Sequence, residues 1–165
     1  MKAEFAYKNV HAIPRIQKVV VNIGTGKVAK ETKLLEKMEA DLAKITGQKP
    51  SVRKAKKSIA GFKLREGVPV GLMVTLRGGR MYDFIDRLVS IALPRSRDFQ
   101  GLSPKAFDQH GNLNIGIKEH NIFPEVSYES LKDIFGLEIT IVTNAGSPER
   151  GAALLKRLGF PLRPA

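Results

Sequence analysis

Residues 18–24 read Lys18-Val19-Val20-Val21-Asn22-Ile23-Gly24, and this run is the strongest structural signal in the chain. β-Branched residues dominate it, which favours an extended strand, and the glycines at Gly24 and Gly26 end the run. Because side chains alternate between the two faces of a strand, Val19, Val21 and Ile23 share one face and Lys18 and Asn22 share the other. The run therefore predicts a strand with one buried and one polar face.

The remaining segments show two kinds of periodicity. Three have apolar residues at helical spacing: 31–46, which Gly47 ends, 81–92, which Pro94 ends, and 147–158, which Ser147, Pro148 and Glu149 open. Four have strand character: 50–53 as a short edge strand, 70–77, 111–123 and 137–143. This order predicts an α+β fold in which helices pack on one face of a mainly antiparallel sheet.

The alternation also predicts which side chains the helices cover. The apolar set is Val19, Val21, Ile23, Leu72, Val74, Leu76, Leu113, Ile115, Leu137, Ile139 and Ile141. The opposite face then carries Lys18, Asn22, Thr75, Arg77, Asn112, Asn114, Lys118 and Thr140. Antiparallel sheets commonly turn such a face to water, but a polar sheet face also serves as a platform for RNA. The pattern alone leaves both interpretations open.

Charge favours a polyanionic partner. The 165 residues contain 28 Lys and Arg against 16 Asp and Glu, a net charge of +12, which suggests one globular domain, 1–165, that binds nucleic acid. The alternative is a basic surface that serves only solubility. Cysteine is absent, which excludes disulfides and thiol chemistry. No apolar run is long enough to cross a membrane, so we expect a cytoplasmic protein without a membrane partner.

The densest basic stretch is residues 49–65, and it lacks acidic residues. We predict a long basic loop over residues 53–67. Its ammonium and guanidinium groups suit phosphate contacts, and Phe62 beside Gly61 offers an apolar tip that can stack on a base. In the alternative interpretation the loop is merely solvated and Phe62 is buried in the core.

The turn after the first strand resembles a dinucleotide-binding pattern. Residues 24–29 read Gly-Thr-Gly-Lys-Val-Ala and fit the loose Gly-x-Gly-x-x-Gly/Ala form. Such a site also needs an acidic residue at the end of the next strand, where this chain has the basic stretch 49–57. The spacing of a phosphate-binding P-loop is missing as well. We therefore expect a tight turn, and keep a nucleotide-dependent enzyme only as the rival hypothesis.

Catalytic and metal sites are not predicted. His11, His110 and His120 lack a metal-ligand spacing, and no serine lies in a nucleophile-elbow motif or a readable triad. We therefore expect no enzyme activity, no metal and no cofactor. A general binder of single-stranded nucleic acid remains a third possibility.

Several longer runs are far more specific than these patterns. They are Tyr7-Lys8-Asn9-Val10, Pro14-Arg15, Val21-Asn22-Ile23-Gly24, the stretch 45–50, the stretch 54–67, Val74-Thr75-Leu76-Arg77-Gly78, Pro94-Arg95 with Asp98-Phe99, Gly111-Asn112 and Phe123-Pro124-Glu125. The same runs stand in the same order in the bacterial-type ribosomal protein L5 family, which this chain resembles over nearly its whole length.

The resemblance implies a non-enzymatic protein of the large ribosomal subunit that attaches 5S rRNA to 23S rRNA in the central protuberance. It also implies contact with the P-site tRNA, with other central-protuberance proteins and with the small-subunit ribosomal protein S13. By family analogy Asn22, Gln48 and Thr75 contact 5S rRNA, and we add Lys18 and Arg77 from the same predicted face. The loop implied to reach tRNA and phosphates contributes Arg53, Lys54, Lys56, Lys57, Ser58, Gly61, Phe62, Lys63 and Arg65.

Overall fold

The computed structural model describes residues 1, 5, 7–26, 31–62, 64–97, 99–126 and 134–163. Its strands are β1 (Ile16–Gly24), β2 (Ser51–Lys54), β3 (Pro69–Leu76), β4 (Leu113–Ile117) and β5 (Leu137–Thr143). Its α-helices are α1 (Thr32–Thr46), α2 (Gly78–Arg87), α3 (Leu93–Arg95) and α4 (Pro148–Arg157).

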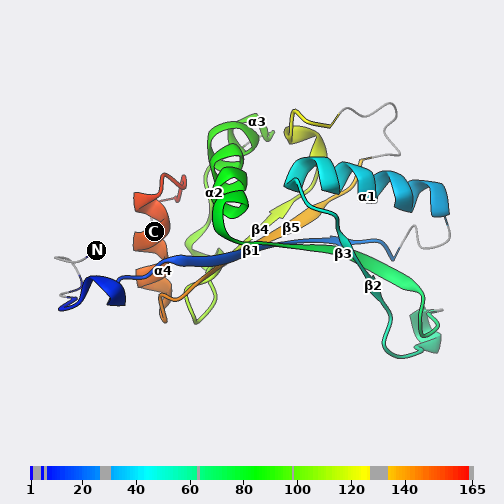
Figure 1. Ribbon diagram of the computed structural model, residues 1–165, viewed down its shortest axis with the longest axis horizontal. Helices are drawn as coiled ribbons and strands as arrows, with labels where there is room; N and C mark the ends of the chain where they lie inside the picture. Colours follow the sequence, from blue (N-terminus) through cyan, green and yellow to red (C-terminus); the bar gives the residue numbers. More distant parts are fainter. Residues whose placement is uncertain are drawn as a thin grey trace.

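The strands form one sheet in the order β2-β3-β1-β5-β4, and every neighbouring pair is antiparallel. The β-branched run at residues 18–24 forms the central strand, where both edges of β1 are paired. Helices α1, α2 and α3 lie on the same side of this sheet, and between the two ends of the sheet no described helix covers its other side (Figure 1). The predicted α+β fold is therefore confirmed.

The covered face is the hydrophobic core. All of the side chains predicted to face the helices are buried, from Val19, Val21 and Ile23 on β1 to Ile139 and Ile141 on β5. Against them pack Met38, Leu42 and Ile45 of α1 and Met81, Phe84 and Ile85 of α2. Burying each such side chain contributes roughly 1.5–3 kcal/mol, so this layer fixes which face of the sheet stays open.

Helix ends follow their sequence signals in α1 and α4. Gly47 ends α1 in the left-handed conformation with φ of 66°, which glycine adopts without strain. Ser147 is the N-cap of α4, and its side chain accepts a hydrogen bond from the Arg150 amide. Pro148 then occupies the first turn, where its missing N–H costs nothing.

The predicted helix 81–92 is wrong at both ends. Helical structure begins at Gly78 and continues through a π-helical turn, Leu88–Ala92, into α3. Pro94 does not end it, since it lies in the first turn of α3. In a π-helical turn the backbone hydrogen bonds join residues five apart, whereas in an α-helix they join residues four apart. The bonding pattern therefore changes just before Pro94, which has no backbone N–H to donate.

The predicted strand 111–123 is also too long. Strand β4 ends at Ile117, and His120–Ile122 form a 3-10 turn. Asn112 lies before the strand and is fully engaged: it donates to both carboxylate oxygens of Asp108, and its Oδ1 accepts from the Thr143 amide. The strand thus ends where the alternation of apolar Leu113, Ile115 and Ile117 with polar residues ends, and the four residues from Lys118 to Asn121 are all polar.

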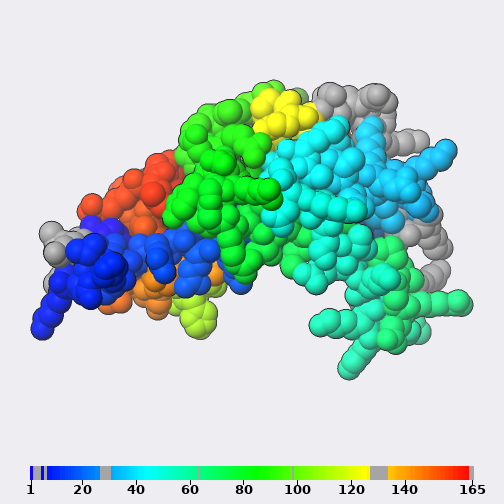
Figure 2. Space-filling view, viewed as in Figure 1, coloured from blue at the N-terminus to red at the C-terminus, as the bar shows by residue number. Residues whose placement is uncertain are grey.

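Residues 53–67, which we call the arm, are not an unstructured loop. The arm extends the β2–β3 hairpin away from the body of the molecule (Figures 1 and 2). The Ala55 amide donates to Val68, the Gly67 amide donates to Ala55, and Ile59 and Leu64 exchange both backbone hydrogen bonds. A 3-10 turn, Ala60–Phe62, forms the tip. The arm is therefore a bonded hairpin in which most of the described side chains are exposed to solvent, Ala55 and Leu64 being the less exposed ones.

Candidate nucleic-acid interface

The uncovered face of the sheet is built by the register of β1 with its neighbours. Val20 stands opposite Thr75 on β3 and Thr140 on β5, and Asn22 stands opposite Met73 and Glu138. Lys18 stands opposite Val142 beyond an irregularity in the register. This arrangement confirms that Lys18, Asn22 and Thr75 share one face, and it places Asn22 and Thr75 diagonally on adjacent strands.

Asn22 and Thr75 keep their polar groups available. Asn22 is exposed and Thr75 is half-buried, and neither side chain makes a hydrogen bond to any residue that the structure describes. An amide and a hydroxyl each supply a donor and an acceptor, which suits ribose hydroxyls and base edges. Their position is fixed by the ladder of β1 and β3, so these groups are held in place before a ligand arrives.

Gln48 reaches the same region from a different direction. It follows α1, and its Nε2 donates to the backbone carbonyl of Thr75 at 3.3 Å. The Gln48 side chain thus lies beside Thr75 of β3, just before the first residue of β2. One of its amide hydrogens is used inside the protein, which fixes the orientation of the group beside Thr75 and leaves its remaining amide groups for a ligand.

Arg53 belongs to this face as well as to the arm. The pairing of β2 with β3 sets Arg53 opposite Gly71, and Gly71 in turn stands opposite Gly24. The Arg53 guanidinium lies 3.7 Å from the Met73 sulfur. Sequence reasoning grouped Arg53 only with the other arm cations, because the strand register that turns it onto the face is not visible in the sequence.

The face changes character toward β4. On β5 and β4 the polar groups satisfy one another, since the Thr140 hydroxyl donates to Asn114 Oδ1 at 2.8 Å. Glu138, exposed opposite Asn22, adds a negative charge that sequence analysis did not single out. A carboxylate repels phosphate, so the part of the face suited to RNA lies over β1, β3 and β2. Arg77, exposed just after β3, borders that part.

The arm carries its cations in the open. Lys54, Lys56, Lys57 and Arg65 are all exposed, as are Ser58 and Gly61. Phe62 at the tip is 80% exposed, which rules out the alternative of a core phenylalanine. The Ser58 hydroxyl accepts from the Glu66 amide at 2.9 Å and braces the hairpin. Lys63 lies outside the described residues.

The turn at Gly24 to Gly26 is tied to the sheet. The Thr25 amide donates to the Val70 carbonyl at 3.0 Å, and the Thr25 side chain is buried. Residues 27–30 lie outside the described part of the chain, and α1 begins only at Thr32. The first described helix after this turn therefore begins at Thr32, and not directly at the second glycine, where a dinucleotide site would need a helix N-terminus.

The histidines have ordinary structural positions. His120 is buried, stacks on Phe135 with ring centroids 3.9 Å apart, and accepts a hydrogen bond from the Phe135 amide at Nδ1. His11 and His110 are exposed. Within the described ranges, no three His, Asp or Glu side chains gather as a metal site would need.

One carboxyl group has a shifted pKa. Burial of Asp108 by itself raises the pKa, but hydrogen bonds from the Asn112 side chain, the Asn112 amide and the His110 amide, together with the charge of His110, outweigh it. The pKa of Asp108 is therefore below its ordinary value. This carboxylate acts as a brace for the loop before β4.

Two family models match the chain. The model described as "Ribosomal protein L5" covers residues 9–65, and a second model, described as the C-terminus of the same ribosomal protein family, covers residues 69–162. The chain belongs to the ribosomal protein L5 family. It is 56% identical over 163 residues to large ribosomal subunit protein uL5 of Trichlorobacter lovleyi, spanning 99% of this chain and 91% of that protein. For uL5 of Synechocystis sp. the identity is 53% with the same coverage, and for uL5c of Ostreococcus tauri it is 54% over 97% of this chain and 87% of that protein.

Membership in the L5 family settles the broad class. The chain is a structural component of the large ribosomal subunit and not an enzyme, so the nucleotide-dependent enzyme is no longer a candidate. RNA binding and a role in translation fit this family. In the portion of the chain that the structure covers, none of the helices combines the length and hydropathy of a membrane span.

Proposed function

We propose that this L5 family member binds 5S rRNA with the uncovered face of its sheet. The observation that carries the proposal is the pair Asn22 and Thr75, whose side chains make no hydrogen bond to described residues and lie on a face that the helices leave open. Gln48, held beside Thr75, extends the polar row, and Lys18, Arg53 and Arg77 supply phosphate contacts around it. Neutral groups in fixed positions select an RNA shape, while cations add affinity without selection.

The same RNA face supports attachment of 5S rRNA to the large subunit. The protein has a net charge of +12, which is more positive charge than contact with the phosphates of one RNA through this face requires. We assign the remaining cations to 23S rRNA in the central protuberance, as the family resemblance implies.

The arm is assigned to the P-site tRNA. It projects from the body, carries Lys54, Lys56, Lys57 and Arg65 in the open, and ends in the exposed ring of Phe62 (Figure 2). Flexible cations match a phosphate backbone and an exposed ring can stack on a nucleobase. A projecting hairpin suits a ligand that arrives and leaves in every elongation cycle.

The contact with the small-subunit ribosomal protein S13 and with other central-protuberance proteins rests on the resemblance. A bridge between subunits needs a protein surface away from both RNA sites. We therefore place it away from the arm and from the face over β1 and β3.

The test is binding of the purified protein to folded 5S rRNA across a salt series, with tRNA and unstructured RNA as competitors. We expect tight binding that prefers 5S rRNA and persists at moderate salt. Weak binding, equal for all RNAs and lost steeply with salt, would instead indicate a general polyanion binder driven by charge alone. Equal competition by unstructured RNA would identify a general single-strand binder.

A further inference from the structure

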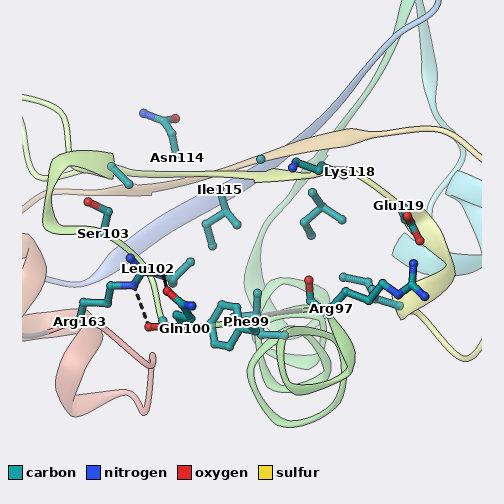
Figure 3. A pocket seen from close by; sticks show the side chains of 17 residues that line it. Arg97, Phe99, Gln100, Leu102, Ser103, Asn114, Ile115, Lys118, Glu119 and Arg163 are labelled. Atoms are coloured by element: carbon teal, nitrogen blue, oxygen red, sulfur yellow. Dashed lines mark hydrogen bonds between the residues drawn. The ribbon is translucent and has the colours of Figure 1, made fainter.

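The outer edge of β4 is unpaired and opens into a groove. Strand β4 is the last strand of the sheet, and beyond the bridge between Phe107 and Leu113 its outer edge pairs with no other described segment. Beside this edge lies a groove of about 590 Å³ between β4 and the segment that follows α3 (Figure 3). An open edge of this kind is a template for another strand.

The direction of the backbone groups follows from one hydrogen bond. The Asp108 amide donates to the Asn112 carbonyl at 2.9 Å, so the backbone groups of Asn112 point to the outer edge. In an antiparallel strand successive residues point their N–H and C=O groups to alternate edges. The groups of Asn114 and Gly116 therefore point outward as well: the Asn114 N–H faces Ala106 across the bridge between Phe107 and Leu113, while the Asn114 carbonyl and both groups of Gly116 face the groove.

The walls of the groove define what side chains it accepts. Phe99, Leu102 and Ile122 line its core side, and Phe99 is only half-buried. Among the described residues, three cations, Arg97, Lys118 and Arg163, and one carboxylate, Glu119, line its rim (Figure 3). Arg163 is held in place because it donates to the carbonyl and the side-chain oxygen of Gln100. The groove is thus apolar on one side and positive at its rim.

We propose that this groove binds an extended acidic peptide segment of a partner protein as an added strand beside β4. The peptide backbone would bond to both groups of Gly116 and to the Asn114 carbonyl, alternate apolar side chains would contact Phe99 and Ile122, and the acidic side chains between them would face the cationic rim. A strand added to a sheet edge gains affinity from backbone bonds and specificity from alternate side chains. Nucleic acid offers no alternating backbone donors and acceptors, and its phosphates do not match the apolar wall.

This site is separate from the proposed RNA face. The strand order puts β5 and β1 between β4 and β3, and Glu138 lies on the uncovered face between the two regions. Loss of peptide binding and loss of 5S rRNA binding are therefore expected to occur independently.

The test uses the intact protein labelled with nitrogen-15 and the blocked peptide Glu-Val-Glu-Val-Glu as the probe. We expect amide shifts at Gly116, Lys118 and Phe99 on titration. The peptide Glu-Pro-Glu-Pro-Glu, which lacks alternate donors, and the basic peptide Lys-Val-Lys-Val-Lys are expected to bind at least about tenfold more weakly. Equal shifts with all three peptides, no shifts with any, or shifts at these amides with a single-stranded RNA oligonucleotide alone overturn the proposal.

Two protein variants localise the effect. Gly116→Pro removes the outward N–H, whereas the matched control Gly116→Ala keeps it, and a Cβ at this position meets no atom within 4 Å. We expect about a tenfold weaker affinity for Gly116→Pro and an unchanged affinity for Gly116→Ala. Lys118→Glu leaves the backbone intact and balances the described rim at two positive and two negative charges, so it is expected to abolish the preference for the acidic over the basic peptide. An unchanged preference in Lys118→Glu, or full affinity in folded Gly116→Pro, contradicts the added strand.

Discussion

The arm and the sheet face beside it are both assigned to RNA, yet they are built in opposite ways. On the face, Asn22 and Thr75 are neutral, short and fixed by strand pairing on both sides of β1. In the arm, the cationic side chains are long and exposed, and a few backbone hydrogen bonds within one hairpin fix the conformation of the chain. In the proposed assignment, selection of an RNA shape and attraction of its charge therefore reside in different parts of the fold and can be changed separately.

The largest difference is expected in stability. The body is packed so closely that a Cβ at Gly151 would lie 2.8 Å from the Gly111 Cα, whereas a Cβ at Gly61 in the arm meets nothing within 4 Å. We expect Gly151→Ala to lower the free energy of unfolding by about 3 kcal/mol because the backbones of α4 and Gly111 must separate. Gly61→Ala serves as the matched control with a change within about 0.5 kcal/mol. Urea denaturation measures the free energy of unfolding of both variants. Similar losses of stability in the two variants would contradict the difference in packing between the body and the arm.

The arm cations are expected to give the next largest effect. The triple variant Lys54→Ala, Lys56→Ala, Lys57→Ala removes three exposed charges, which lowers the salt slope of tRNA binding by about 2 to 3 and weakens affinity at low salt. Binding to isolated 5S rRNA is expected to change little. Filter binding across a salt series measures both slopes. An equal loss for 5S rRNA would mean that the arm and the face share one ligand.

The neutral face residues are expected to show the complementary behaviour. Asn22→Ala or Thr75→Ala removes a polar group that no described residue satisfies, so folding stability should hold while 5S rRNA affinity falls by about 1–2 kcal/mol. The salt slope should stay the same, because no charge is lost. Thr140→Ala on the same face, where the hydroxyl already bonds Asn114, is the control with unchanged affinity. A reduced salt slope in Asn22→Ala would contradict the division of roles.

The smallest effect concerns the side chains that brace each region. Asp108 has a lowered pKa in the folded protein, so the stability that it contributes is present above its unfolded-state pKa and is lost as the pH falls through the folded value. We expect Asp108→Ala to be less stable than the parent at neutral pH and to match it in acid. Ser58→Ala in the arm removes a single bond to the Glu66 amide and should show no such pH dependence. Thermal unfolding at a series of pH values checks both variants, and a constant difference for Asp108→Ala would contradict the assignment.

Local periodicity predicted most of the sheet, and long-range pairing explains the errors. The run at 18–24 and residues 137–143 are strands because their own residues favour extension and burial. Helical structure continues past the predicted end because a π turn, Leu88–Ala92, joins α2 to α3, and Pro94 lies in the first turn of α3, where its missing N–H is tolerated. The alternation ends at Lys118, and the chain leaves the sheet where His120 is buried against Phe135, so the predicted strand was extended too far, to Phe123.

The sequence predicted the kinds of residue that form the candidate site, but it did not predict how they are arranged in space. Alternation identified Asn22 and Thr75, and charge identified the arm. The placement of Arg53 on the face and of Glu138 beside Asn22 depends on which residues of different strands stand opposite each other. A single sequence does not contain that register. The open edge of β4 could not be foreseen either, since its place at the end of the sheet follows from the whole strand order.

The pairing of β1 with β5 also governs when the molecule can finish folding. The central strand lies near the start of the chain and one of its two neighbours lies near the end, joined through pairs such as Asn22 with Glu138. Synthesis proceeds from the N-terminus, so β1, β2 and β3 emerge well before β5 exists. During that interval one edge of β1 is exposed, and a nascent chain in this state is vulnerable to wrong strand pairing until its final quarter arrives.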